Sequence, residues 1–195
     1  MPIKVYKPTS AGRRTASVQD FSDITKKRPE KSLVLRLQSR SGRNNTGKIT
    51  VRHQGGGVKK LYRQVDFHQI RFDAPAKVIA IEYDPNRGPR LALIEYQDGD
   101  KAYILAAEGM KVGDAALSAR KKIEAVPGAR MPLQFIPVGL FVYNIELTPG
   151  KGGQIVRGAG AGAQLQVLEG DMAQVKLPSG EVRLIHKECM ASVGK

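Results

Sequence analysis

The chain has 195 residues, 41% of them hydrophobic, so it can bury one large core or two small ones. Its formal net charge of +14 indicates a polyanionic partner, and nucleic acid is the commonest one. An anionic membrane is the rival partner, but the sequence has neither a long apolar run nor a strongly amphipathic basic helix. The single cysteine, Cys189, excludes an internal disulfide framework and a cysteine-based zinc site.

The positive charge is concentrated near the N-terminus. Residues 1–72 hold 17 Lys and Arg against 4 Asp and Glu, a net of +13, whereas residues 73–195 hold 15 against 14, a net of +1. Between Lys31 and Val65 stand nine basic residues and no acidic one. Scattered charges usually form a solvated face, but an acid-free run of this length repels itself unless anions neutralise it. The run therefore favours polyanion binding.

The first third of the chain predicts an extended basic arm followed by a few strands. The arm is polar, interrupted by proline and without hydrophobic periodicity, which is typical of segments that become ordered only on a partner. Short strand-like runs follow at Leu33–Gln38, Ile49–His53 and Leu61–Ile70. Polar and glycine-rich loops separate these runs.

The middle of the chain predicts a small barrel. Lys77–Tyr83, Leu91–Tyr96, Lys101–Leu105 and Val112–Leu117 are short runs of strand-forming residues. A Pro- and Gly-containing turn joins the first pair, and Asp98-Gly99 joins the second, which is a strong hairpin signal. Several short strands at near-regular spacing indicate a barrel of the OB type.

A second small barrel is predicted after a break at Pro127–Pro132. Its expected strands are Leu133–Ile136, Leu140–Leu147, Gln164–Leu168, Met172–Leu177 and Val182–His186. Between them lies the glycine-rich segment Thr148–Ala163, in which Lys151 and Arg157 are the only charges. Such a segment is either a flexible linker or a backbone that approaches a partner closely, and its two cations favour the second interpretation.

Two glycine-containing motifs resemble nucleotide-binding sequences but fail on context. Gly42–Lys48 matches a phosphate-binding P-loop, yet Ile49 stands where a Ser or Thr must place its hydroxyl on Mg²⁺. A strand is also predicted after this motif, where a P-loop requires a helix. Gly158–Ala163 offers a loose dinucleotide fingerprint without a βαβ unit. The Arg, Lys and Asn side chains of the first motif suit contacts to phosphates, sugars and bases instead.

No catalytic group of residues emerges from the reactive side chains. The histidines His53, His68 and His186 lack the spacing of metal ligands. Cys189 has no arranged base, so we expect it to be buried or inert. Tyr62 lies between basic residues and is expected to stack on a base, whereas Phe67 is expected to face a core. We therefore expect no enzyme activity, no metal and no cofactor.

Eight uncommon strings match a known family in the same order. They are YKPTSAGRR at 6–14, DITKKRPEKSL at 23–33, GRNNTGKITVRHQGGG at 42–57, KKLYRQVDF at 59–67, EYDPNRGPRLAL at 82–93, DGDKAYILA at 98–106, NIELTPGKGGQ at 144–154 and LPSGEVR at 177–183. From residue 3 to the end the chain resembles the family of universal large-subunit ribosomal protein two, in its bacterial or organellar form. The resemblance implies an OB-type barrel joined to an SH3-like barrel and RNA contact at Arg87 and Arg157. It also implies roles in subunit assembly, subunit association and support of the peptidyl-transferase region.

Three features depart from the family pattern. Val58 stands where the family usually has a His, which removes one polar RNA contact. Residues 156–160 differ from the Ala-Arg-Ser-Ala-Gly that the family often has but keep its Arg. Family members normally continue past the position of Lys195 into a basic extension that holds a histidine near the peptidyl-transferase centre. We expect the chain to lack that extension, so its role is assigned to none of these residues.

The sequence thus predicts a mostly β protein with an extended basic N-terminal arm over 1–32, an OB-type barrel over 33–126 and an SH3-like barrel over 127–195. We expect a constituent of the large ribosomal subunit whose partners are ribosomal RNA and neighbouring ribosomal proteins, with no membrane contact and no homo-oligomer. Its expected location is a cytoplasmic ribosome, with an organellar ribosome as the alternative. A free OB-fold translation factor that binds RNA transiently is the alternative function. The residues expected to contact RNA are Lys4, Lys7, Arg13, Arg14, Arg43, Asn44, Asn45, Lys48, Arg52, His53, Lys59, Lys60, Tyr62, Arg63, Arg87, Arg90, Lys151 and Arg157.

Overall fold

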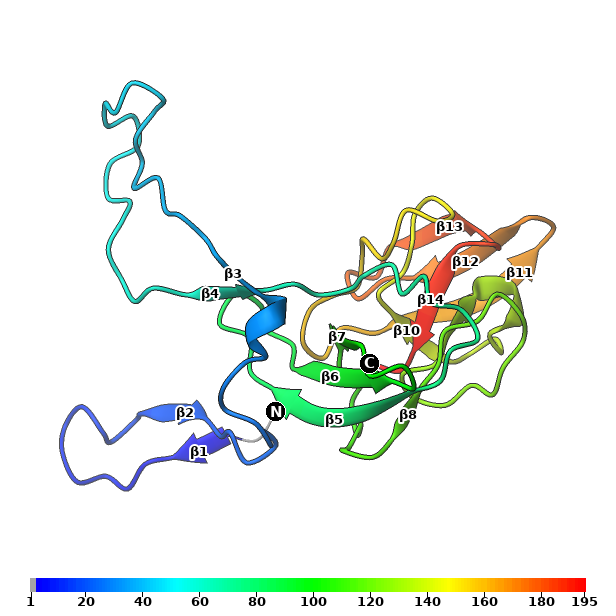
Figure 1. Cartoon of the computed structure of the whole chain (residues 1–195), viewed down its shortest axis with the longest axis horizontal. Coiled ribbons are helices and arrows are strands. Elements are labelled where there is room, and N and C mark those ends of the chain that lie inside the picture. Colours follow the sequence, from blue (N-terminus) through cyan, green and yellow to red (C-terminus); the bar gives the residue numbers. More distant parts are fainter. Residues whose placement is uncertain (1–2) are drawn as a thin grey trace.

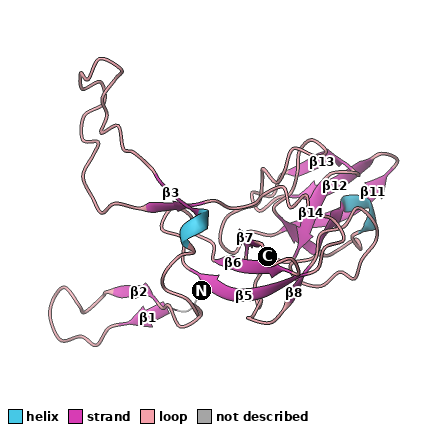
Figure 2. Cartoon of the chain, viewed as in Figure 1, coloured by secondary structure: helices cyan, strands magenta, loops and turns pink. Residues whose placement is uncertain are grey.

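The computed structural model describes residues 3–195 and shows an almost all-β chain (Figure 2). Two larger sheets form the body of the molecule, and two thin loops project from it (Figure 1). The helical turns in the described range are the short 3₁₀ helices Lys31–Leu33 and Leu133–Phe135. Neither has the length and hydrophobicity that a membrane span requires.

The first sheet is the half-barrel of the predicted OB-type unit. Its strands are β5 (Ala76–Glu82), β6 (Leu91–Tyr96), β7 (Lys101–Leu105) and β8 (Ala115–Ala116), antiparallel in the order β7-β6-β5-β8. Both faces of β6 are covered, so its run of apolar residues is buried almost throughout. The core is built on fully buried side chains such as Val78, Leu91, Leu93 and Tyr103.

The second sheet forms the predicted SH3-like unit. Its strands are β9 (Arg130–Pro132), β10 (Phe141–Tyr143), β11 (Ala163–Glu169), β12 (Met172–Lys176), β13 (Val182–His186) and β14 (Met190–Val193). All pairs are antiparallel, in the order β13-β12-β11-β10-β14-β9. Buried Met131, Val142, Leu165 and Val175 contribute to a second core, separate from the first. The mostly β fold class with two small barrels is therefore confirmed.

Two short hairpins carry the projecting loops. β1 (Ile3–Val5) pairs with β2 (Ser17–Gln19), and β3 (Val34–Arg36) pairs with β4 (Leu61–Arg63). The β3–β4 hairpin holds the base of a long loop, residues 37–60, which extends away from the body as the cyan trace in Figure 1. All residues of this loop except Gly42 are exposed, so the loop has no core of its own.

The segment before β3 differs from the predicted extended arm. Residues 3–19 form the β1–β2 hairpin, and the residues after it dock on the first sheet. The Thr25 amide donates to the Ile81 carbonyl at 3.0 Å, and the Ile81 amide donates to Thr25 Oγ1 at 2.9 Å. The Glu30 amide donates to the Tyr103 hydroxyl at 2.8 Å. Residues 1 and 2 of the predicted arm lie outside the described residues.

Several predicted strands are confirmed and others are wrong. The predicted ranges of β6, β7 and β13 match the structure residue for residue. The predicted strand Ile49–His53 is absent, because these residues lie in the exposed loop and only Ile49 forms an isolated bridge, with Arg43. The strand predicted over Leu133–Ile136 is a 3₁₀ turn that follows β9. β14 was not predicted, although it pairs with both β10 and β9.

The two units contact each other directly. The Tyr143 hydroxyl of the second unit donates to the Leu105 carbonyl of the first at 3.2 Å, and Tyr143 packs with the first core. Burial raises the pKa of this phenol, which therefore remains a hydrogen-bond donor at ordinary pH. The Glu108 amide donates to the Lys195 carbonyl at 2.8 Å. These contacts place the loops of the two units beside each other.

Candidate nucleic-acid interface

The tip of the projecting loop is a compact turn held by one asparagine. Asn44 Oδ1 accepts hydrogen bonds from the amides of Thr46 and Lys48 at 3.0 and 2.9 Å. Gly42 has φ +67°, and a Cβ there would lie 2.1 Å from the Val51 carbonyl oxygen, so only glycine fits. No helix follows, which removes the structural context of a P-loop. The turn displays its side chains to solvent instead.

The cations that line the projecting loop have no carboxylate partner among the described residues. They are Arg40, Lys48, Arg52, Lys59 and Lys60, together with Arg43, whose Nη1 donates to the Gly47 carbonyl at 2.8 Å. Within residues 3–195 none of these side chains forms an ion pair with a carboxylate. Exposed cations that the protein itself leaves unneutralised are suited to phosphate groups, and Asn45 and His53 are exposed beside them.

The β1–β2 hairpin presents a second group of predicted RNA-contact residues. The Arg13 guanidinium lies 5.0 Å from the centre of the Tyr6 ring, and Lys4 Nζ lies 6.0 Å from it. Lys7 and Arg14 are exposed on the connection between the two strands. The hairpin and the projecting loop therefore offer separate basic surfaces on separate extensions of the body (Figure 1).

The structure corrects the prediction for Arg63 and Arg90. Both are buried, with exposed fractions of 5% and 7%. Arg63 Nε lies 3.9 Å from the buried carboxylate of Glu82, whose pKa is raised by burial. Arg90 Nε donates to Asp23 at 2.8 Å, and this hydrogen bond lowers the pKa of the Asp23 carboxyl group. These guanidinium groups are internal partners of carboxylates and are not available to RNA.

Arg87 and Arg157 come together on one aromatic ring, although they belong to different units. The Arg87 guanidinium lies 5.6 Å from the centre of the Phe67 ring, and that of Arg157 lies 4.6 Å from it. Arg87 also stacks on Tyr62 at 4.6 Å and donates to Asp84 at 2.7 Å. Phe67 packs against the first core, as predicted. One face of Tyr62 is occupied by Arg87, so only its remaining surface is open to a base.

The first part of the glycine-rich segment makes specific backbone contacts. The Gly153 amide donates to the Phe67 carbonyl at 2.9 Å, which ties the segment to the first unit. A Cβ at Gly153 would lie 1.9 Å from Asn144 Oδ1, so the close approach requires glycine. Val156 has φ +54°, a strained conformation for a β-branched residue, and it directly precedes Arg157. These contacts favour the interpretation of this segment as a backbone that approaches other groups closely.

A buried ion pair that sequence reasoning missed anchors the start of this segment. Glu146 is 2% exposed and accepts hydrogen bonds from the amides of Gly150, Gly152 and Met190 at 3.1, 3.2 and 3.1 Å. Arg130 Nη2 donates to the same carboxylate at 3.1 Å. Burial lowers the pKa of the Arg130 guanidinium, and the charge of Glu146 opposes that shift. The sequence signal was Glu146 within the predicted strand Leu140–Leu147, whereas Arg130 lay in the predicted break between the two units.

The reactive side chains serve the structure. Cys189 is fully buried, and burial raises the pKa of its thiol to about 11, so it carries no thiolate at neutral pH. The imidazole of His68 lies beside Gly152, and His186 is half-buried on β13. The described residues contain no group of three His, Cys, Asp or Glu that could hold a metal ion. The groups that the candidate interface exposes are cations, backbone amides and aromatic rings.

Comparison with known families identifies both units. The model of the ribosomal proteins L2 RNA-binding N-terminal domain matches residues 30–118. The model of the ribosomal proteins L2 C-terminal domain matches residues 126–195. Together they cover about four fifths of the chain, and they correspond to the OB-type and SH3-like units described above. The chain therefore belongs to the ribosomal protein L2 family, whose members are structural, RNA-binding proteins of the large ribosomal subunit.

Proposed function

We propose that the protein is a permanent constituent of the large subunit that supports its assembly, its association with the small subunit and the peptidyl-transferase region. The observation that carries the proposal is the loop 37–60, which holds six cations and no carboxylate and belongs to neither core of the described residues 3–195. A solvated loop of like charges lowers its electrostatic energy when phosphates surround it. Its length allows it to reach RNA far from the barrels (Figure 1).

We propose that the RNA contacts are divided among three parts of the chain. The arm over 1–32 supplies the hairpin cations, the OB-type unit over 33–126 supplies the projecting loop, and the SH3-like unit over 127–195 supplies the glycine-rich segment. Cations neutralise phosphates in all three, while amides and aromatic rings contact looped RNA. The residues proposed for contact are Lys4, Lys7, Arg13, Arg14, Arg43, Asn44, Asn45, Lys48, Arg52, His53, Lys59, Lys60, Tyr62, Arg87, Lys151 and Arg157.

Sedimentation of ribosomes from cells that carry a tagged copy of the chain tests this proposal. We expect the tagged chain to migrate with large subunits and with joined ribosomes, and to remain there after a moderate salt wash. Depletion of the chain should accumulate incomplete large-subunit particles. A tagged chain found mainly in the soluble fraction, with large subunits of normal mass after depletion, would contradict permanent incorporation and favour a transient translation factor.

A further inference from the structure

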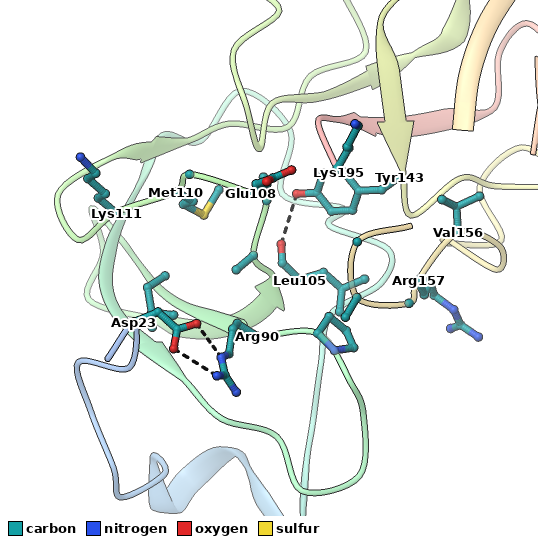
Figure 3. A pocket seen from close by; sticks show the side chains of 18 of the residues that line it. Asp23, Arg90, Leu105, Glu108, Met110, Lys111, Tyr143, Val156, Arg157 and Lys195 are labelled. Carbon is teal, nitrogen blue, oxygen red and sulfur yellow. Dashed lines mark hydrogen bonds and ion pairs between the residues drawn. The ribbon is translucent and has the colours of Figure 1, made fainter. Parts of the chain in front are cut away.

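Strand β13 lies at an open edge of the second sheet (Figure 1). It pairs with β12 on one side, and among the described residues no strand pairs with its other side. None of its residues lines the recess between the two units, where the Tyr143 hydroxyl donates to the Leu105 carbonyl (Figure 3). The contacts that join the two units therefore leave this edge free.

The backbone groups that face the open edge follow from the hydrogen bonds at the two ends of the β12–β13 hairpin. The Leu177 amide donates to the Glu181 carbonyl at 2.8 Å, and the Lys187 amide donates to the Asp171 carbonyl at 2.9 Å. Hydrogen-bonded and non-hydrogen-bonded positions alternate along an antiparallel pair, and this pair has no bulge. The odd-numbered residues of β13 therefore bond to β12, and the even-numbered residues turn their amide and carbonyl groups outward.

The residues with outward backbone groups also have exposed apolar side chains. Val182 is 50% exposed and Leu184 is 63% exposed, and within residues 3–195 their amide and carbonyl groups meet no partner. The strand register places Leu184 beside Gln174 of β12, and Gln174 beside the exposed Val167 of β11. A strand edge with free backbone groups and exposed apolar side chains is a template for a further strand. RNA has no ladder of amide and carbonyl groups, so it would leave this edge unpaired.

The edge strand is complementary to itself in the antiparallel direction. A pairing of two copies centred on Leu184 places the two leucines opposite each other and Val182 opposite His186 of the second copy. The same register places Glu181 opposite Lys187 of the second copy, once at each end of the paired strands. Opposite charges that face each other across two strands stabilise the pairing. The charges of this strand therefore match a second copy of the chain.

Other registers of the same pairing are less favourable. A pairing centred on Arg183 would place two arginines opposite each other, and like charges in that position are destabilising. A pairing centred on Val182 would place Leu184 opposite Gly180, so the most exposed apolar side chain of the strand would gain no apolar partner. The register centred on Leu184 is the one that combines apolar contact with charge complementarity.

We propose that the free protein forms a twofold dimer through β13, in which the second sheets of the two copies join into one sheet. A twofold contact uses the same surface on both copies, as this pairing does. The dimer goes beyond RNA binding and concerns the chain before it enters a ribosome. It covers an edge that would otherwise pair with other chains and favour aggregation. We expected no homo-oligomer from the sequence, so the test below decides between that expectation and the dimer.

Sedimentation velocity of the full chain, freed of RNA by a high-salt wash, tests the dimer over a wide range of protein concentration. We expect the unchanged protein to pass from monomer to dimer as its concentration rises. Leu184→Lys places two like charges at the centre of the pairing and should raise the dissociation constant about tenfold or more. Val138→Lys, at a side chain 55% exposed and outside β13, is the matched control and should leave the dimer intact. Thermal unfolding of each variant verifies folding.

An exchange of charges tests the register. Glu181→Lys alone places two cations opposite each other at each end of the pairing, and Lys187→Glu alone places two anions there. Each single variant should weaken the dimer, whereas the double variant should restore it, because opposite charges face each other again. A double variant that dimerises no better than the single variants would overturn this register.

Cross-linking tests which residues face each other. Facing residues of a hydrogen-bonded antiparallel pair have Cα atoms about 5.5 Å apart, which a disulfide can bridge. Leu184→Cys should therefore form a covalent dimer on mild oxidation, while the native Cys189 is fully buried. Ser179→Cys, exposed on the turn before β13, is the control and should cross-link much less. Equal cross-linking of the two variants, or an unchanged protein that stays monomeric at every concentration, would overturn the dimer.

Discussion

Two arginines that the sequence analysis expected to contact RNA are instead buried beside carboxylates. Arg63 belongs to the acid-free basic run, yet it is buried against Glu82. Arg90 is buried against Asp23. The sequence analysis expected both arginines to contact RNA. Their carboxylate partners are distant in the chain, and sequence spacing alone does not show which arginine a distant carboxylate will contact. Phe67, in contrast, was predicted to face a core, because its place in an alternating apolar run carried that information.

Phe67 holds the two arginines that belong to different units. Replacement Phe67→Leu keeps an apolar side chain but removes the ring face, so Arg87 and Arg157 lose a shared support worth about 0.5–1 kcal/mol per cation–π contact at exposed sites. We expect RNA affinity to fall about three- to tenfold, with a small change in thermal stability. Phe72→Leu is the matched control, since among the described residues Phe72 supports the guanidinium of Arg120, at 4.6 Å, and neither Arg87 nor Arg157. Equal RNA affinities for the two variants would contradict this role.

Glu146 stabilises the second unit through a buried charge. In the Glu146→Gln variant the Arg130 guanidinium would remain buried without a carboxylate, and breaking a buried pair on one side costs about 3–5 kcal/mol. We expect chemical denaturation to report a loss of this size. Glu181→Gln breaks the exposed pair with Arg183, and its effect should stay below about 1 kcal/mol. If Glu146→Gln lowered the free energy of unfolding no more than the control does, the buried pair would stabilise the fold no more than an exposed pair.

At the scale of elements, strands rich in apolar and β-branched residues were predictable, and strands defined by their partners were not. β6, β7 and β13 carry enough apolar and β-branched residues to be recognised alone. β14 has four residues and forms because β9 and β10 lie on its two sides. β1 and β2 consist of three residues each, and Ile3 and Val5 remain exposed even in the hairpin. No hydrophobic pattern could have indicated them.

We expect the docking of the segment after β2 to depend on pH through Asp23. The hydrogen bond to Arg90 lowers the pKa of this carboxyl group below 3.8. Because the pKa of Asp23 is lower in the folded state than in the unfolded state, its carboxylate stabilises the docked segment at any pH above the unfolded-state pKa. This contribution is lost as the pH falls through the folded-state pKa. We expect NMR shifts of Thr25 and Arg90 to be constant from neutral pH to about pH 5 and to change below about pH 4. Asp23→Asn should show weakened docking at neutral pH, and an unshifted Asp23 titration would contradict the account.

At the scale of the whole molecule, a body of two packed units carries two extensions, the β1–β2 hairpin and the loop 37–60. The net charge falls from +13 in residues 1–72 to +1 in residues 73–195, and from this split we expect residues 73–195 to fold without RNA and residues 1–32 to be disordered in the free protein. The structure revises that boundary, because Leu33, Val65 and Phe67 pack against the first core and residues after β2 dock on it. The separable part is the loop 37–60, since Arg36 pairs directly with Leu61 at its base.

This pairing allows the loop to be removed cleanly. Replacing residues 37–60 by Asn-Gly would close β3 and β4 with a two-residue hairpin turn. A second variant keeps the loop but replaces its six cations, Arg40, Arg43, Lys48, Arg52, Lys59 and Lys60, by Gln. Both variants should unfold cooperatively at nearly the temperature of the unchanged protein, because the loop contributes nothing to either core. A large loss of thermal stability in both would show that the loop is part of the folded body.

The salt dependence of binding to large-subunit ribosomal RNA tests the central claim most directly. Each phosphate neutralised contributes about −0.7 to −0.9 to the slope of log affinity against log salt concentration. We predict a steep negative slope for the unchanged protein and a slope shallower by up to about 4–5 units for both loop variants, with the six lost cations as the cause. A slope near zero for the unchanged protein, or equal slopes for all three proteins, would contradict the account.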